Sequence, residues 1–198
     1  RQCLLVTDEN VRNAGHPEKV LAALKSFGNI DCALCTLPAG EKHKTLNTVE
    51  YICRSAAAAG LDRKGIMIAF SGGVTGDLTG FAAAIYMRGI DFIQLPSTLL
   101  AAVDSSVGGK TGADLPDGKN LVGAFHQPLL VAMDMQTLTT LPETEWRNGL
   151  AEIVKYGVIM DLEFFELLEK NLDKLNCFDL DFYEECLMDL TDEELKHF

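Results

Sequence analysis

The architecture of this chain is set by Ile66-Met-Ile-Ala-Phe-Ser-Gly-Gly-Val-Thr-Gly-Asp-Leu-Thr-Gly80. Its first five residues form an unbroken apolar run, which favours a strand of a parallel sheet covered on both faces. A glycine-rich turn follows, and Phe81-Ala-Ala-Ala-Ile-Tyr86 then predicts an apolar helix. A strand, such a turn and a helix, in this order, present backbone N–H groups and a helix N-terminus to a phosphate. The Rossmann spacing G-x-G-x-x-G is not met, so a tight turn without a ligand remains the alternative.

Strands and helices alternate on both sides of this stretch. Strands are predicted at residues 1–7, 31–36, 66–70, 91–95 and 129–133, and helices at 16–27, 45–59, 81–86 and 99–103. The alternation predicts an α/β fold, with a Rossmann-like parallel-sheet, nucleotide-binding domain over residues 1–140. From residue 141 the pattern is helical, so residues 141–198 are predicted to be the first helices of an incomplete all-helical domain. Because a strand begins almost at residue 1, we expect the N-terminal strands of the first domain to be missing.

The charge is concentrated near the C-terminus. Residues 161–198 hold 13 acidic residues and 3 lysines, a net charge of −10 out of −12 for the chain. The tail is therefore predicted to form one or two acidic amphipathic helices, and the body is nearly neutral. This distribution excludes a nucleic-acid-binding face, which would be basic. No apolar segment reaches the length of a membrane span and no secretory leader opens the chain, so we expect a cytoplasmic protein.

A second polar run lies at Asp104-Ser-Ser-Val-Gly-Gly-Lys-Thr-Gly112, followed by Gly118-Lys-Asn120. Glycines allow close backbone approach to a ligand, lysines bind phosphate, and hydroxyls and a carboxylate bind an oxygen-rich substrate. The run predicts a loop that binds a small phosphorylated polyol or acid, although an ordinary surface loop has a similar composition. It is not a Walker A loop, because Asp104 stands where that motif needs glycine. Downstream, Glu152 and Lys155 share a helix face, where a surface ion pair is the plain alternative to a functional role.

The motifs occur in an order that resembles one enzyme family. They are Leu4-Leu-Val-Thr-Asp-Glu-Asn10, Leu37-Pro-Ala-Gly-Glu41 with Lys44, Gly72-Gly-Val-Thr-Gly-Asp77, Tyr86-Met-Arg-Gly89, Gln94-Leu-Pro-Ser-Thr-Leu-Leu100, the run from Val103 to Gly112, Gly118-Lys-Asn120, Leu138-Thr-Thr-Leu-Pro142 and Ala151-Glu-Ile-Val-Lys-Tyr-Gly157. Together they resemble 3-dehydroquinate synthase. That family converts 3-deoxy-arabino-heptulosonate 7-phosphate to 3-dehydroquinate and phosphate in the shikimate pathway. It does so by NAD-mediated transient oxidation, phosphate elimination, reduction and ring closure.

The resemblance implies cofactors, partners and site residues. The family binds NAD and a divalent metal, usually zinc with cobalt as an alternative, and forms homodimers. By resemblance, NAD would be met by Asp8, Glu41, Lys44, Gly72, Gly73, Val74, Asp77, Thr98, Lys119, Thr140 and Glu145. The phosphorylated substrate would be met by Arg88, Asp104, Lys110, Asn120 and Lys155, and the metal by Glu152.

The sequence also departs from the family pattern. Ser71 and Ser97 replace a glycine and a threonine that the family commonly has, and both keep a small side chain. The family's metal-binding histidines come from a later Gly-His-Thr segment, which these residues lack, and His197 stands in a different context. We therefore expect this 198-residue chain to be inactive by itself. Two alternatives remain: another sugar-phosphate cyclase, such as 2-deoxy-scyllo-inosose synthase, or a non-catalytic relic that dimerises or senses NAD.

Overall fold

The computed structural model describes residues 2–28, 30–176 and 178–194. Its main sheet has four parallel strands in the order β2-β1-β3-β4. These are β1 (Cys3–Asp8), β2 (Cys32–Leu37), β3 (Ile66–Ser71) and β4 (Asp91–Pro96). All four were predicted from the sequence, and the α/β fold class is confirmed. Within the described residues, no helix has the length and apolarity needed to cross a membrane.

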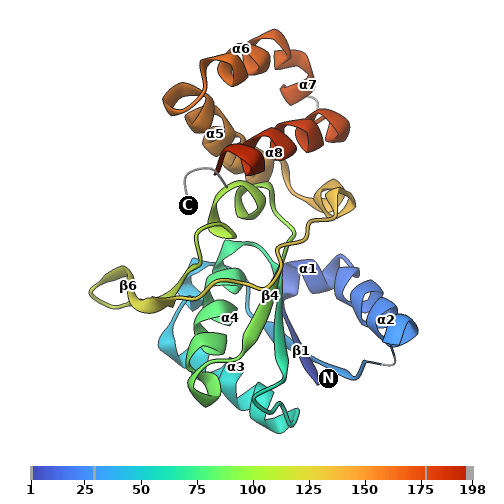
Figure 1. Ribbon diagram of the computed structural model, residues 1–198, viewed down its shortest axis with the longest axis vertical. Helices are drawn as coiled ribbons and strands as arrows, with labels where there is room; N and C mark the ends of the chain where they lie inside the picture. Colours follow the sequence, from blue (N-terminus) through green and yellow to red (C-terminus); the bar gives the residue numbers. More distant parts are fainter. Residues whose placement is uncertain (1, 29, 177, 195–198) are drawn as a thin grey trace.

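Helices cover both faces of this sheet (Figure 1). On one face lie α1 (Glu9–Asn13) and α2 (His16–Gly28), and on the other lie α3 (Leu46–Ala58) and α4 (Gly73–Ile85). Strand β1 shows why two layers form, because successive side chains of a strand point to opposite faces. Leu4 and Val6 pack with α3 and α4, whereas Cys3 and Leu5 pack with α2. The strand is therefore apolar on both faces from Cys3 to Val6.

Helix α4 begins at Gly73, eight residues before the predicted start at Phe81. Most of the glycine-rich segment is thus the first half of a helix and not a turn. Glycine weakens a helix by about 1 kcal/mol per residue, which is why the pattern predicted a turn. The glycines are kept because α4 packs closely: a Cβ atom on Gly76 would lie 3.2 Å from Oε1 of Gln94.

The run from Asp104 to Gly112 is not the simple loop that the sequence predicted. Its start is the π-helical turn η3 (Ala101–Ser105), and its end enters an antiparallel hairpin of β5 (Lys110–Leu115) and β6 (Gly118–Phe125). The hairpin projects from the side of the molecule (Figure 1). It was missed because its strands are rich in glycine, which is depleted in strands.

The strand predicted at residues 129–133 is wrong. This segment lies along β4 and exchanges three backbone hydrogen bonds with it, but only Val131 pairs in register, opposite Gln94. Pro128, which has no N–H group, precedes the segment, and Asp134 caps the 3-10 helix η4 (Met135–Thr140) directly after it.

The C-terminal part is helical, with α5 (Glu143–Ile159), α6 (Leu162–Lys170), α7 (Leu172–Asn176) and α8 (Leu180–Glu194). Figure 1 shows these helices gathered at one end of the molecule. Their core surrounds Trp146, whose ring contacts Phe178 at 5.1 Å and Tyr183 at 4.9 Å between centroids. The predicted amphipathic character of the acidic tail is confirmed, because α8 buries Phe182 and Tyr183. The same core takes in Leu99, Ala102 and Val103, which precede the predicted boundary at residue 140.

Two further short helices complete the chain. These are the 3-10 helices η1 (Glu41–His43), which leads to α3, and η2 (Tyr86–Arg88), which links α4 to β4.

Candidate functional site

A large cavity opens where the parallel strands β1, β3 and β4 end. Its volume is 910 Å³. In an open parallel sheet, ligands bind at the carboxyl ends of the strands, which is where this cavity lies. Every residue predicted to meet NAD lines it: Asp8, Glu41, Lys44, Gly72, Gly73, Val74, Asp77, Thr98, Lys119, Thr140 and Glu145. The structure thus brings together residues from six separate segments of the chain.

The N-terminus of α4 faces this cavity. Gly72 is the N-cap and makes no side-chain capping bond, so the cap itself does not occupy the first-turn N–H groups. Gly72 and Gly73, which we call the glycine cradle, also let the start of α4 lie close to Thr98 and Ser105. A Cβ atom on Gly72 would lie 3.1 Å from Cγ2 of Thr98, and one on Gly73 would lie 2.6 Å from Oγ of Ser105. The cradle therefore suits a phosphate group that approaches the backbone.

Two buried hydroxyls beside the cradle support a polar ligand there. The Oγ atoms of Ser97 and Ser105 are buried and find no hydrogen-bond partner among the residues that the structure describes. Both residues line the large cavity. A buried hydroxyl without a partner costs free energy, so these two groups fit a ligand that supplies the missing bonds. The residues present therefore fit a dinucleotide.

A second cavity of 480 Å³ adjoins the first and lies against the hairpin. Three of the residues predicted to meet the substrate, Asp104, Lys110 and Asn120, line it. Four residues line both cavities and form what we call the junction: Asp77, Asp104, Ser105 and Asn120. A ligand in one cavity is therefore next to a ligand in the other.

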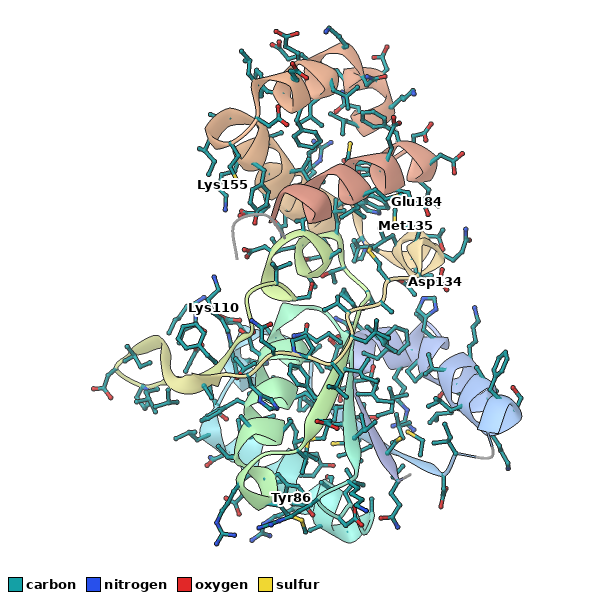
Figure 2. The ribbon with its side chains drawn as sticks, viewed as in Figure 1. Tyr86, Lys110, Asp134, Met135, Lys155 and Glu184 are labelled. Carbon is teal, nitrogen blue, oxygen red and sulfur yellow. The ribbon has the colours of Figure 1, made fainter. Side chains whose placement is uncertain are left out.

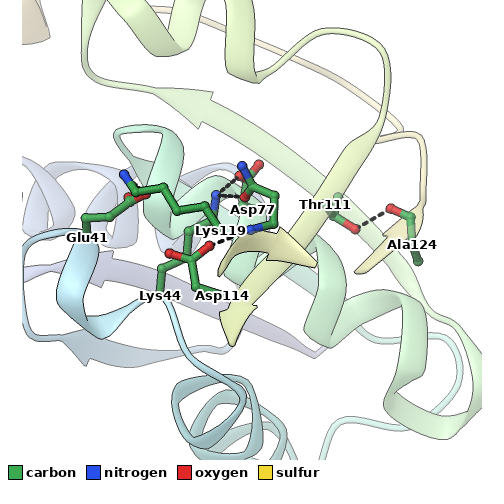
Figure 3. A network of polar contacts seen from close by, with 8 residues as sticks. Glu41, Lys44, Asp77, Thr111, Asp114, Lys119 and Ala124 are labelled. Atoms are coloured by element: carbon green, nitrogen blue, oxygen red, sulfur yellow. Dashed lines mark hydrogen bonds and ion pairs between the residues drawn. The ribbon is translucent and has the colours of Figure 1, made fainter. Parts of the chain in front are cut away.

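The buried side chain of Lys44 contacts two residues of this junction (Figure 3). The Nζ atom of Lys44 donates to Oδ2 of Asp77 at 2.5 Å and to Oδ1 of Asn120 at 2.6 Å. Burial raises the pKa of the Asp77 carboxyl, while the hydrogen bond and positive charge of Lys44 lower it and the negative charges of Glu41 and Asp104 raise it further. A carboxylate can be kept in this partly buried place because its charge is paired.

Exposed charges lie at the outer edge of the cavity. Lys119 and Glu41 form an ion pair of 3.0 Å, and this hydrogen bond raises the pKa of the Lys119 ammonium. Figure 3 shows the pair beside the buried Lys44 network. Both side chains are substantially exposed to solvent, so a ligand can displace their mutual contact at little cost.

Sequence reasoning missed residues that hold the predicted ones in place. Ser71 donates to Asp8 at 2.5 Å, and His16 bonds Oγ1 of Thr140 at 2.9 Å. Asp114 accepts from the backbone N–H of Asn120 at 2.7 Å. The position of Ser71 directly after an apolar strand was a usable signal, whereas nothing near His16 in the sequence indicates its partner 124 residues away.

Arg88 does not line either cavity. It belongs to η2, which precedes β4, so it lies at the amino end of that strand while the cavities lie at the carboxyl ends. Figure 2 shows Tyr86, the first residue of η2, at the end of the molecule away from the helical part. In a parallel sheet these two ends are opposite, so the structure does not bring Arg88 to the other predicted substrate residues within this chain.

Glu152 and Lys155 are not brought to the cavities either. They lie on α5 and form an ion pair with each other, and the Lys155 ammonium lies 4.8 Å from the centroid of the Tyr156 ring. Across residues 2–28, 30–176 and 178–194, no group of three histidine, cysteine or acidic residues could hold a metal ion. His197 lies outside the described residues. The residues present do not complete a zinc site, which needs three or four protein ligands.

Known proteins resemble this chain over most of its length. The family model for the N-terminal part of 3-dehydroquinate synthase matches residues 34–148. A 3-dehydroquinate synthase from Pelobacter propionicus is 52% identical over 173 residues, which are 87% of this chain and 48% of that protein. The chain thus spans about half the length of the curated relatives that it matches.

Two solved structures are similar over nearly the whole chain. One is 2-epi-5-epi-valiolone synthase from Streptomyces hygroscopicus with NAD+ and Zn2+ bound, at 30% identity and a TM-score of 0.85, covering 98% of this chain and 53% of that one. The other is 2-deoxy-scyllo-inosose synthase with carbaglucose-6-phosphate, NAD+ and Co2+, at 32% identity and a TM-score of 0.82, covering 96% and 52%. With the family model covering more than half of its residues, this chain belongs to the 3-dehydroquinate synthase family.

Proposed function

We propose that this chain supplies the NAD-binding part and the first helices of a 3-dehydroquinate synthase. The reaction would convert 3-deoxy-arabino-heptulosonate 7-phosphate to 3-dehydroquinate and phosphate. The observation that carries the proposal is the pair of adjoining cavities, one lined by all eleven predicted NAD residues and the other by three of the predicted substrate residues. About 50% identity to relatives named 3-dehydroquinate synthase favours this substrate over those of the other cyclases.

The large cavity would hold NAD. The α4 N-terminus and its glycine cradle would receive the pyrophosphate, because first-turn N–H groups and the helix dipole favour negative charge. Asp8 is the last residue of β1, and a carboxylate there can accept bonds from ribose hydroxyls. When bound, NAD supplies reversible hydride transfer, which makes a neighbouring C–H acidic. The residues that line the large cavity would hold NAD next to the junction.

The second cavity would hold the phosphorylated substrate. Lys110 provides a positive charge at the start of β5, where it can neutralise an anionic group of the substrate. Asp104 and Asn120 line both cavities and can bond substrate hydroxyls beside the cofactor. The roles of Arg88 and Lys155 stay predictions, because neither lines the large cavity or the second cavity.

We propose a bound divalent metal for the whole protein, and not for these 198 residues by themselves. The similar cyclases carry Zn2+ or Co2+, whereas the described residues of this chain hold no group of three possible ligands, and Glu152 is the one ligand that the resemblance implies here. We therefore derive no step through a metal, and we propose that the 198 residues alone do not turn over substrate. We further propose that the whole protein is cytoplasmic, acts in the shikimate pathway and forms a homodimer. Light scattering of the whole protein would test the dimer.

Another sugar-phosphate cyclase is the second candidate, and the high TM-scores to two such enzymes support it. The test is a phosphate-release assay with a panel of cyclase substrates on the product of the longest open reading frame that contains these residues. We expect release with the heptulosonate phosphate and none with the 198-residue chain. Release only with another sugar phosphate would favour the second candidate. A frame that ends near residue 198, with no activity, would favour the non-catalytic relic.

A further inference from the structure

Lys44 is buried although it is a lysine. Its side chain is 6% exposed, and its ammonium reaches Asp77 on α4 and Asn120 on β6. Lysine is almost never fully buried unless its charge is paired. Here both partners belong to the junction between the cavities, so Lys44 contacts two of the four residues that border both ligands.

Asn120 needs support to keep its conformation. Its φ of 55° lies in the left-handed region, which is uncommon for a residue other than glycine. The hairpin is also irregular here, with a register shift between Ala113 and Leu115. Residues held in such conformations persist when their surroundings determine them, and they gather at ligand sites.

Lys44 supplies this support from two of its groups. Its carbonyl oxygen accepts from the N–H of Asp114 at 2.7 Å, and Asp114 in turn accepts from the N–H of Asn120 at 2.7 Å. Its ammonium donates directly to the Asn120 side chain. The backbone and the side chain of Lys44 thus both hold the end of the hairpin against the start of α3.

From this geometry we infer that Lys44 is a positioning residue, which fixes Asn120 at the junction so that its amide donates to the substrate. An ammonium has donors only, so the atom of Asn120 that faces it is the amide oxygen. The amide nitrogen of Asn120 donates to no residue that the structure describes, and it is the group left to meet a ligand. This inference rests on the proposed function for the identity of that ligand.

The role differs from the contact with NAD that the resemblance implies. With bonds of 2.5 and 2.6 Å to Asp77 and Asn120, two of the three ammonium donors are used within the protein. Asp77 provides the negative charge that makes burial of Lys44 acceptable, and Lys44 in turn favours the ionised form of Asp77. Lys44 lines the large cavity and yet directs its charge to the junction.

The first test uses nuclear magnetic resonance on the 198-residue chain. In the wild-type chain we expect a slowly exchanging Lys44 ammonium resonance with a contact to the Asn120 side chain. In Lys44→Met the order parameter of the Asn120 side-chain amide should fall from about 0.8 to below about 0.6, since the amide loses its anchor. Lys42→Met is the matched control, because Lys42 is exposed in η1, the short helix that ends just before Lys44, and it should change neither signal.

The second test is a double-mutant cycle on NAD affinity measured by calorimetry. Because Asn120 lines the large cavity as well as the second one, Asn120→Ala should itself weaken NAD binding. If Lys44 acts through Asn120, the variant carrying both Lys44→Met and Asn120→Ala should then bind NAD no more weakly than the worse single variant. Additive losses would indicate an independent contact of Lys44 with the cofactor and would overturn the inference. An unchanged order parameter in Lys44→Met would overturn it as well.

The outcomes separate this inference from the proposed function. If the wild-type chain does not bind NAD, the proposed function loses its support, and the order parameter still decides the role of Lys44. If Lys44→Met does not fold, the wild-type ammonium resonance decides, because its absence would mean that Lys44 is not held by Asn120.

Discussion

The hydroxyl of Ser71 donates a 2.5 Å hydrogen bond to Oδ2 of Asp8, and this bond joins the carboxyl ends of the neighbouring strands β1 and β3. The other carboxylate oxygen of Asp8 accepts from the N–H of Val11 at 3.0 Å and caps α1. Ser71, which stands in place of a glycine common in the family, therefore has a structural role. It fixes a carboxylate that we propose meets the cofactor.

Replacing Ser71 by alanine should lower the free energy of unfolding. A hydrogen bond to a charged acceptor contributes about 1.5–3 kcal/mol, and we expect a loss at the lower end of this range because Asp8 is partly exposed. Urea denaturation followed by circular dichroism measures it. Ser26→Ala is the control, since the exposed Ser26 hydroxyl bonds the carbonyl of Ala23 in its own helix and no other group that the structure describes. Equal losses in the two variants would contradict the role of Ser71.

Replacing Gly80 by alanine should destabilise the contact between α4 and the hairpin. A Cβ atom at Gly80 would overlap Cγ2 of Thr111 and lie 3.1 Å from the ring of Phe92. Overpacking of this kind costs about 1–3 kcal/mol. The second substitution Thr111→Ser removes the overlapping methyl group and keeps the hydroxyl that donates to Ala124.

Denaturation of the single and double variants tests this contact. We expect Gly80→Ala, Thr111→Ser to recover at least half of the stability that Gly80→Ala loses. If Thr111→Ser recovers nothing, the close approach of α4 to β5 is not the reason for glycine at position 80.

The main sheet was predictable because each strand is a compact apolar run between turn residues. The start of α4 was not, since local propensity opposes a helix through Gly73, Gly76 and Gly80. What favours glycine there is contact with Ser105, Gln94 and Thr111, which lie far along the chain. The hairpin was missed for a similar reason. Its register is held by α4 and by Lys44, and not by an alternating pattern of its own.

Site residues were predictable where their motifs directly follow the carboxyl ends of parallel strands. Gly72 and Thr98 closely follow β3 and β4, and the topology alone brings them to one edge. Arg88 precedes β4, so the same rule, applied strictly, would have placed it at the opposite edge. The bond between Lys44 and Asn120 joins residues 76 positions apart, and no sequence pattern indicates it.

Replacing Gly73 by alanine should weaken NAD binding about tenfold, because the added Cβ would lie 2.6 Å from Oγ of Ser105 at the helix N-terminus. Calorimetric titration of the 198-residue chain measures the affinity. Gly28→Ala, outside the cavity, is the control and should bind as the wild type does, because its Cβ would lie 3.3 Å from the Ile30 side chain and away from the cavity lining. Unchanged affinity in Gly73→Ala would place the pyrophosphate away from α4.

Replacing Asp77 by asparagine should change how stability depends on pH. Burial raises the folded-state pKa of Asp77 above its unfolded value, although Lys44 opposes this effect, and Glu41 and Asp104 add to it. Between these two pKa values the folded state binds more protons than the unfolded state, so this carboxyl makes the protein less stable as pH rises.

The measurement is the free energy of unfolding of the wild type and of Asp77→Asn between pH 4 and 7. The wild-type value minus the variant value should fall as pH rises from about 4 through the raised pKa, and then level off. A difference that rises with pH would mean that Lys44 dominates over burial and that the pKa of Asp77 is lowered in the folded protein.

Replacing Gly149 by alanine should disrupt the packing of α5 on the segment that follows β4. A Cβ atom at Gly149 would lie 2.6 Å from Cβ of Leu99 and 2.7 Å from the backbone nitrogen of Leu100. Backbone atoms cannot yield as a side-chain end can, so the cost is about 2–3 kcal/mol, partly offset by about 1 kcal/mol of better helix propensity. Thermal unfolding should therefore begin a few degrees lower.

Trp146, the single tryptophan, lies one turn before Gly149 in the helical core, so its fluorescence reports this region. Gly157→Ala in the same helix is the matched control. Its Cβ would lie 3.1 Å from Cα and 3.3 Å from the backbone nitrogen of Phe165, which is a milder overlap than at Gly149, so its loss should be smaller. If Gly149→Ala instead raised the unfolding temperature, as alanine does at an exposed helical glycine, α5 would not lie as close to Leu99 as the structure shows. The helical core would then not depend on the residues that precede the predicted boundary.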